Sequence, residues 1–319
     1  MARPSDFAPL AITSRSGLDE SVHFGAVVAL DRDGSIALAV GNPEAVVYPR
    51  SSNKPMQSVA MVRAGLHLDR RLLALVCASH DGTPAHTSAA IDILAGAGLD
   101  AAALGNTPGL PLDDDAARAV VCSGGGPVPL TMNCSGKHAG MLATCVRNGW
   151  EHAGSSYLRI DHPLQLAITR VIDELAGEPH HHIGIDGCGA PAHALSLVGL
   201  ARSFRAIATG TGGVGSAAVY AAMTSFPEMV GGDQRDVTVL MRAVPGLMAK
   251  DGADGVFAAA LPDGRAVALK VADGGDRARP PVMVAALRAL GVDVQAVGAL
   301  SSPVLGHGAR VGEVRAVLA

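Results

Sequence analysis

Aromatic residues make up only 3% of the 319 residues, and charged residues only 17%. The formal net charge is −4, and the sequence has no basic block and no aromatic residues interleaved with basic ones. This composition excludes nucleic acid as an expected partner. No apolar run is long enough for a signal peptide or a membrane span, so we expect a cytoplasmic protein with no membrane partner.

Cysteine is also scarce, and an odd number of five without an export signal does not indicate a disulfide framework. Hydrophobic residues nevertheless reach 49%, which is enough for one large domain or two interlocked ones. With so few aromatic residues, Ala, Val and Leu must fill most of the core. The 39 glycines and 19 prolines are spread along the chain, which argues against a disordered tail.

Strand-like segments lie near both ends of the chain. Residues 22–30 and 35–41 are apolar runs separated by DRDG, and residues 255–261 and 265–271 are separated by a PDG turn. Each pair predicts a β-hairpin. The C-terminal tail is expected to supply one more strand.

The middle of the chain is predicted to be mostly helical. Proline and glycine mark helix ends at Pro163 and Gly177 and again around residues 280–291. Further helices are expected at 56–66, 197–208, 214–225 and 233–244.

These elements predict an α+β fold, in which strands from both termini form one antiparallel sheet, packed by helices, with a mainly helical part inserted. We expect a single domain over residues 1–319. Its α/β part spans about 12–80 and 245–319, and its helical part spans about 81–244. Hairpins at both ends argue against a doubly wound parallel sheet.

The segment RSSNKP places Ser51 three residues before Lys54. Pro55 predicts that a helix starts at about Ser51 or Ser52, which would bring both side chains to one face of its first turn. A desolvated, neutral Lys54 could then take the proton of Ser51. The alternative is a serine N-cap beside a solvated lysine.

Three further segments carry reactive side chains. CASHDG offers Ser79 and His80, or else forms a structural turn. NCSGKHAG places Cys134 and His138 at i, i+4, where they could share a helical face. Cys188, in the loop IDGCGAP, could join Cys134 in binding zinc, since two thiolates are typical of such sites.

Lys250 comes just before the C-terminal hairpin. At a strand edge facing a pocket, its amine could pair with a nucleophilic serine. A lysine in a solvent-exposed turn is the alternative.

Together the segments RSSNKPMQ, CASHDG, NCSGKHAGML, DHPLQ, IDGCGAP and that of Lys250 resemble the type-II-like asparaginases typified by the inducible rhizobial enzyme. The resemblance covers about residues 12–275 and is looser between Thr83 and Cys122 and near the C-terminus. It implies a fold similar to serine β-lactamases and glutaminases, a homodimer, and hydrolysis of asparagine to aspartate and ammonia.

The resemblance also implies roles for individual residues. Ser51 with Lys54 and Ser79 with Lys250 match two catalytic serine–lysine pairs. Positions that bind a zinc ion match Cys134, Lys137 and Cys188, and positions that line the substrate pocket match Arg50, His80, His138 and Asp186.

We therefore predict that Ser51 attacks the side-chain amide of asparagine after losing its proton to Lys54. An acyl-enzyme forms, and water releases aspartate. Arg50 suits the substrate carboxylate and Asp186 its ammonium group. The alternatives are a glutaminase, whose pocket is one methylene longer, a penicillin-recognising hydrolase, for which a KTG-type strand motif is lacking, and a catalytically silent binding protein.

Overall fold

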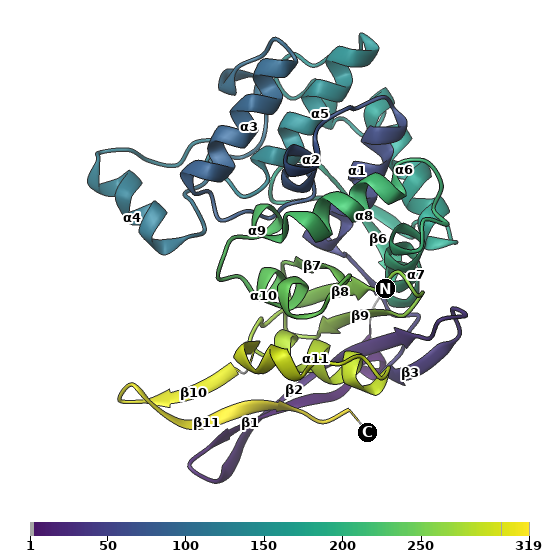
Figure 1. Cartoon of the computed structure of the whole chain (residues 1–319), viewed down its shortest axis with the longest axis vertical. Coiled ribbons are helices and arrows are strands. Elements are labelled where there is room, and N and C mark those ends of the chain that lie inside the picture. The colour runs from purple at the N-terminus through teal and green to yellow at the C-terminus, as the bar shows by residue number, and fades with distance from the viewer. Residues whose placement is uncertain (1–2, 301, 319) are drawn as a thin grey trace.

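The computed structural model describes residues 3–300 and 302–318. Its strands lie mainly at the two ends of the sequence, and its helices lie mainly between them (Figure 1). The strands are β1 (Ala8–Arg15), β2 (Leu18–Leu30), β3 (Ile36–Val40), β4 (Val46–Val47), β5 (His182–Ile185), β6 (Pro191–Ser196), β7 (Met248–Gly252), β8 (Val256–Ala260), β9 (Ala266–Val271), β10 (Ser302–Gly306) and β11 (Ala309–Ala316).

The helices begin at α1 (Lys54–Arg63), directly after the 3-10 turn η2 (Arg50–Asn53). Those that follow are α2 (Arg70–Val76), α3 (Pro84–Gly96), α4 (Asp114–Cys122), α5 (Ser135–Asn148), α6 (Pro163–Ala176), α7 (Leu197–Ala208), α8 (Ser216–Ser225), α9 (Pro227–Val230), α10 (Asp236–Ala243) and α11 (Arg279–Ala289). The other 3-10 turns are η1 (Pro4–Asp6), η3 (Ala101–Ala103), η4 (Ser156–Leu158) and η5 (Gln295–Leu300).

Strands from both ends of the chain form one sheet, as the sequence predicts. The sheet has eight strands in the order β10-β11-β1-β2-β9-β8-β7, and β3 pairs with β2 beside this path. All of its pairings are antiparallel, including β1 with β11, where Ala11 faces Ala316. Both predicted hairpins are present, as β2 with β3 and β8 with β9. The predicted α+β fold is therefore confirmed.

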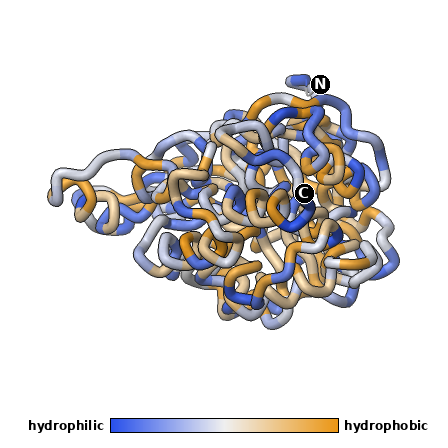
Figure 2. Tube along the Cα trace, turned by 90° about the horizontal axis from the view of Figure 1, so that it is seen from above, coloured by the Kyte–Doolittle hydropathy of each residue, from blue (hydrophilic) through white to orange (hydrophobic). Residues whose placement is uncertain are grey.

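Both faces of the central strands are covered. Every residue of β8 is buried, and side chains alternate between the two faces of a strand, so neither face is open to solvent. Helices α7 and α11 pack against these strands. Alanine and valine dominate β8 and β9, which agrees with a core built from small aliphatic residues. Figure 2 shows that the hydrophobic stretches are spread through the whole body of the molecule.

The helical part follows the predicted proline and glycine signals. Helix α6 starts at Pro163, and Gly177 ends it in the left-handed conformation with φ 69°. Helix α7 has the bounds expected from the sequence, and α1, α8, α10 and α11 lie within a few residues of their predictions. A small second sheet, β4-β6-β5, joins this part to the segment before Arg50.

Three features differ from the predictions. The C-terminal tail forms a hairpin, β10 with β11, where one strand was expected. Strands β1 and β7 were not predicted, and β7 carries Lys250. The 3-10 turn η2 occupies the position where the first turn of an α-helix was expected.

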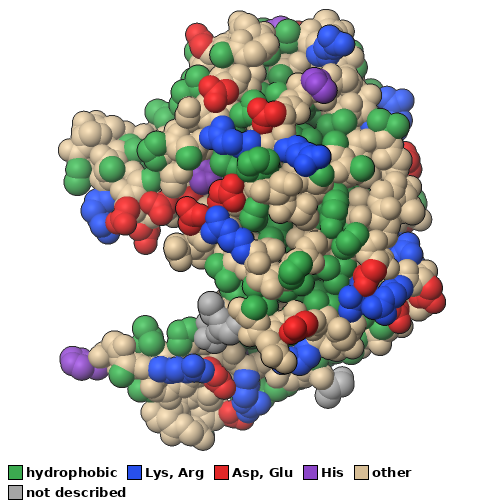
Figure 3. All heavy atoms as spheres, in the orientation of Figure 1, with side chains coloured by type: hydrophobic (Ala, Val, Ile, Leu, Met, Phe, Trp, Pro, Cys, Tyr) green, Lys and Arg blue, Asp and Glu red, His purple; other side chains and the backbone are tan. Residues whose placement is uncertain are grey.

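Two parts of the molecule project from its body. Helix α4 and the β10–β11 hairpin project on the same side, α4 above and the hairpin below in Figure 1, and Figure 3 shows a notch between them. No helix within residues 3–300 and 302–318 has the length and apolarity needed to cross a membrane.

Candidate active site

The residue before Ser51 has an unusual backbone conformation. Arg50 has φ 51°, in the left-handed region that L-residues with large side chains rarely adopt. It follows β4 and begins η2, so the chain reverses sharply just before Ser51. Such backbone strain of about 1–3 kcal/mol persists only where surrounding contacts impose it, and it often marks a functional site.

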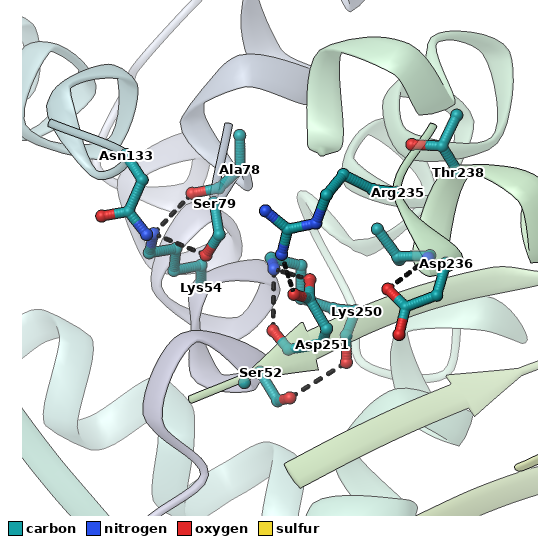
Figure 4. Close-up of polar contacts among 12 residues, drawn as sticks. Ser52, Lys54, Ala78, Ser79, Asn133, Arg235, Asp236, Thr238, Lys250 and Asp251 are labelled. Atoms are coloured by element: carbon teal, nitrogen blue, oxygen red, sulfur yellow. Dashed lines mark hydrogen bonds and ion pairs between the residues drawn. The ribbon is translucent and has the colours of Figure 1, made fainter. Parts of the chain in front are cut away.

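Lys54 lies at the centre of a buried polar cluster (Figure 4). Its Nζ lies 2.5 Å from the carbonyl oxygen of Ala78, 3.1 Å from Ser79 Oγ and 3.0 Å from Cys134 Sγ. These three acceptors match the three N–H groups of an ammonium ion. Lys54 therefore joins the start of α1 to the segment after α2 and to the start of α5.

The structure pairs Lys54 with Ser79, whereas the sequence predicts a pair with Ser51. The backbone N–H of Lys54 donates to the Ser51 carbonyl across the 3-10 turn, while the Lys54 amine reaches into the buried cluster, where Ser79 accepts from it. The hydroxyl of Ser51 forms no hydrogen bond with the described residues. The next serine, Ser52, donates to the Lys250 carbonyl at 2.9 Å.

Lys250 is fully buried, and its amine contacts its neighbour Asp251. Lys250 Nζ lies 2.5 Å from Asp251 Oδ1 and 2.7 Å from the Asp251 carbonyl oxygen. Burial lowers the pKa of Lys250 to about 8, and the positive charge of Lys54 acts in the same direction, against the attraction of Asp251. The predicted contact between Lys250 and Ser79 is not among the hydrogen bonds of the described residues.

Arg50 and Asp186, which the sequence analysis assigns to opposite charges of one substrate, form an ion pair. Arg50 Nε lies 2.9 Å from Asp186 Oδ1, and Nη1 contacts the exposed carboxylate of Asp254. Asp186 is held in the loop after β5, where its backbone N–H donates to the Ala190 carbonyl. The site thus presents a cationic and an anionic group side by side.

The two predicted zinc-binding cysteines form a separate buried cluster with Ala190. Lys137 Nζ lies 3.1 Å from Cys188 Sγ. The neighbouring sulfur of Cys188 and burial raise the pKa of Cys134, while Cys134 and the Lys137 ammonium lower the pKa of Cys188 against the effect of burial. Although burial alone would lower it, the sulfurs of Cys188 and Cys134 raise the pKa of Lys137.

Metal ligands of the usual kinds are too few for a standard site. Within the part of the chain that the structure describes, no three His, Cys, Asp or Glu side chains are grouped to hold a metal ion. All five cysteines are free of disulfide bonds. A zinc ion between Cys134 and Cys188 would therefore need a further type of ligand, and the Lys137 amine is at hand.

His80 and His138 are buried and held in fixed orientations. The N–H of Gly82 donates to His80 Nδ1, so Nε2 carries the proton and donates to Ser135 Oγ at 2.9 Å. Burial lowers the pKa of His80 well below its usual value, and that of His138 to about 4. His138 Nδ1 lies 2.8 Å from the Tyr157 hydroxyl. Both rings are therefore neutral at pH 7.

The sequence analysis missed an ionic network beside Lys250. Arg235 contacts Asp81 and Asp251, and Arg279 contacts Asp236 and lies 4.0 Å from Asp251. A carboxylate directly after Lys250 was the one available signal. Nothing local in the sequence around Arg235 links it to residues far away in the chain.

Comparison with known families decides how these segments are to be interpreted. Residues 11–316 match the family described as L-asparaginase II. The chain belongs to the L-asparaginase II family. The match covers every segment of the site described above.

Among solved structures, this chain is similar to two crystal structures of Mglu in its native form, the second determined in the presence of 4.3 M NaCl. The identities are 13% and 14%, the TM-scores are 0.46 and 0.36, and each match covers 85% of this chain. The matches cover 66% and 61% of the Mglu chains, so this chain spans less than two thirds of their length. No curated protein matches the sequence significantly.

Proposed function

We propose that the protein is an L-asparaginase, which hydrolyses asparagine to aspartate and ammonia with a serine nucleophile. The observation that carries this proposal is the buried Lys54 amine, 3.1 Å from Ser79 Oγ and three residues after Ser51. A lysine amine that has lost its proton is a suitable base for a serine hydroxyl. Family membership supports the amide as the bond that is cleaved.

The ion pair of Arg50 and Asp186 suits the zwitterionic end of an amino acid. The guanidinium would bind the substrate α-carboxylate, and the carboxylate of Asp186 would bind the α-ammonium. The substrate carboxylate would then replace Asp186 as the partner of Arg50, and the substrate ammonium would replace Arg50 as the partner of Asp186, in place of their 2.9 Å contact. The reacting amide would extend from this anchor toward the neighbouring residue, Ser51.

We propose that Ser51 attacks the amide carbon and that its proton passes to the Lys54–Ser79 pair. Ser51 directly follows the strained Arg50, and its hydroxyl has no hydrogen-bond partner within residues 3–300 and 302–318. The C–N bond of the amide then breaks, and the nitrogen leaves as ammonia after taking a proton from the pair. Water hydrolyses the resulting seryl ester, with Lys250 as a second base, since its pKa of about 8 leaves part of it neutral near pH 7.

Ammonia release from asparagine and glutamine, side by side, tests this proposal. We expect asparagine to be hydrolysed, and Ser51→Ala and Ser79→Ala each to lower kcat by at least about 100-fold, because each removes one member of the proton-transfer chain. Ser58→Ala is the matched control, because its buried hydroxyl bonds the Lys54 backbone carbonyl and the Cys77 thiol and contacts neither serine of the proposed site.

Trapping the acyl-enzyme by acid quench and peptide mapping separates the two serines. An adduct on the peptide of Ser51 supports the assignment, and an adduct on Ser79 would reverse the two roles. Faster release from glutamine than from asparagine would make the protein a glutaminase. No release from either amide would leave the fold with a binding role.

We also propose that Cys134, Lys137 and Cys188 hold a zinc ion. The two buried cysteines belong to one packed cluster, with the Lys137 amine 3.1 Å from Cys188 Sγ, and this donor set fits zinc once the amine loses its proton. Zinc would supply positive charge at the two sulfurs. The residues themselves would hold the start of α5 against the loop that carries Asp186.

Elemental analysis of protein purified with zinc present checks this site. We expect about one zinc ion per chain in the wild type, and a loss of most of it in Cys188→Ala. Cys145→Ala removes a buried thiol outside the cluster and is expected to keep the metal. Equal zinc in all three proteins would rule out this binding site.

The homodimer remains a prediction from the resemblance, and the cytoplasmic location remains a prediction from the sequence. Light scattering of the purified protein would give twice the chain mass of 32.1 kDa for a dimer.

A further inference from the structure

Arg235 connects two segments of the site that are far apart in the sequence. It lies just before α10, and its guanidinium contacts two carboxylates at once, of which Figure 4 shows that of Asp251. Nη1 lies 3.1 Å from Asp81 Oδ1, and Nη2 lies 2.6 Å from Asp251 Oδ2. Both carboxylates are largely buried, with side-chain exposures of 10% and 5%. Two such contacts from one planar group fix the relative positions of the two segments that contain these carboxylates.

The first carboxylate belongs to the segment of Ser79. The backbone N–H groups of Ser79 and Asp81 donate to the carbonyls of Val230 and Gly231, at 3.0 and 2.7 Å. The next residue, Gly232, passes so close that a Cβ there would lie 1.8 Å from Asp81 Oδ2. The chain therefore wraps around Asp81 before it reaches Arg235, and the Ser79 segment is held by both backbone and side-chain contacts.

The second carboxylate is shared between Arg235 and Lys250. Asp251 Oδ1 accepts from Lys250 Nζ at 2.5 Å, and Oδ2 accepts from Arg235. A third cation, Arg279, lies 4.0 Å from Oδ2. Asp251 shares its one negative charge among three cations, so it stabilises the Lys250 ammonium less than an unshared carboxylate would.

We propose that Arg235 is a positioning residue for amide hydrolysis, which holds the Ser79 segment against β7 and weakens the hold of Asp251 on the Lys250 proton. This inference rests on the proposed function only where activity is the readout. Arg235 itself is about a quarter exposed and contacts neither serine.

Several charged and titratable groups surround the Lys250 amine. They come from β7, α1, the segment before α10, the C-terminal end of α2 and the loop that follows it: Asp251, Lys54, Arg235, Cys77 and His80. Cys77 and His80 are neutral at pH 7, because burial raises the pKa of the thiol to about 12 and lowers the pKa of the imidazole. Arg235 and Arg279 both share the Asp251 partner of Lys250, and Arg235 is the nearer, at 2.6 Å against 4.0 Å.

The sign of the effect follows from the charges. Removing the Arg235 charge leaves Asp251 to Lys250, which favours the ammonium form and raises the pKa of Lys250 above about 8. The neutral amine is the active form, so the rising limb of kcat/KM against pH moves to higher pH. A shift of about one pH unit lowers kcat/KM about tenfold at pH 7.

The test compares Arg235→Gln with Arg242→Gln. Arg242 lies on α10 and contacts the carboxylates of Glu228 and Asp233 at the surface, so it is a matched arginine outside the site. We expect the limb to move up by about one unit in Arg235→Gln and to stay in place in Arg242→Gln. Arg235→Lys keeps the charge but cannot contact both carboxylates in the same way. The rising limb of kcat/KM against pH should therefore return to its wild-type position, while kcat stays low.

A second readout does not depend on activity. The chain has only four lysines, Lys54, Lys137, Lys250 and Lys270, so ε-¹³C-lysine NMR gives few signals, and Lys250→Arg assigns the one of interest. The Lys250 signal should titrate at higher pH in Arg235→Gln than in the wild type. This measurement stands even if the wild type releases no ammonia, which would contradict the proposed function alone.

Two outcomes would overturn the inference. The first is a lowered kcat in Arg235→Gln with an unmoved limb and an unmoved Lys250 signal, which would make Arg235 purely structural. The second is full activity at all pH values. If circular dichroism shows that Arg235→Gln is unfolded, Arg235→Lys replaces it in the test. An unchanged kcat with an unchanged pH profile would then contradict the positioning role. A lowered kcat with an unchanged pH profile would support it.

Discussion

Replacing Lys54 with methionine is expected to lower kcat for asparagine by about 1,000-fold or more, close to the full contribution of general acid–base catalysis. Methionine has a similar length and suits a buried site, but it has no amine for the proton of a serine. The contacts to the Ala78 carbonyl, Ser79 Oγ and Cys134 Sγ all disappear together. Ammonia release at saturating asparagine measures the loss, and thermal unfolding shows whether the fold is kept.

The matched control is Lys270→Met, since Lys54, Lys137 and Lys250 are fully buried and Lys270 is the one lysine that is not. The Lys270 amine contacts the carbonyl of Asp254 in the turn between β7 and β8. We expect kcat to change by no more than a few-fold in this variant. If a well-folded Lys54→Met protein kept most of its activity, Lys54 would not be the base.

Replacing Arg50 with methionine is expected to lower kcat/KM for asparagine by about 100-fold, mostly through a higher KM. The guanidinium is proposed to bind the α-carboxylate, and a lost charge-assisted hydrogen bond costs about 1.5–3 kcal/mol. Asp186 would also lose its partner at 2.9 Å, which leaves a partly buried carboxylate unpaired. Steady-state kinetics over a wide range of asparagine concentration separates KM from kcat.

A truncated substrate makes this prediction specific. β-Alaninamide is asparagine without its α-carboxylate, so the wild type should prefer asparagine strongly, and Arg50→Met should lose most of that preference. Arg63→Met is the control, because Arg63 forms its ion pair with Glu174 on α6, away from the site. An Arg50→Met protein that kept the preference would mean that another residue binds the carboxylate.

Local signals in the sequence were enough to predict two hairpins and the helices α1, α6, α7, α8, α10 and α11, but not β4 to β6 or α2 to α4. The turns between β2 and β3 and between β8 and β9 contain the Asp and Gly that a hairpin needs, and Pro163 and Gly177 set the ends of α6. Strand β7 was not predicted, because MAKDG is short and buried on both faces and so has no alternating pattern. Motif matching likewise identified the segments of the site before any geometry was known.

The pairing of side chains within the site could not be predicted in the same way. Spacing in the sequence suggested Ser51 for Lys54, yet a long flexible side chain reaches any acceptor that the tertiary fold brings near, and here that is Ser79. The amine of Lys250 contacts the adjacent Asp251, whose other oxygen is held by Arg235. Such contacts depend on how α1, α10 and β7 pack, which no local pattern encodes.

The pairing of β1 with β11 has a consequence for the order of folding. Ala11 and Ala316 come from opposite ends of the chain, and β2 pairs with β9. The sheet can therefore be completed only after nearly all residues have left the ribosome. Until then, the first hairpin exposes two unpaired edges, which can associate with other chains. Such non-local pairing also slows folding, because the entropy of a very long loop must be lost before the contacts form. Refolding from denaturant is therefore expected to be slow and to give lower yields at high protein concentration, with the N-terminal strands as the segment most in need of a chaperone.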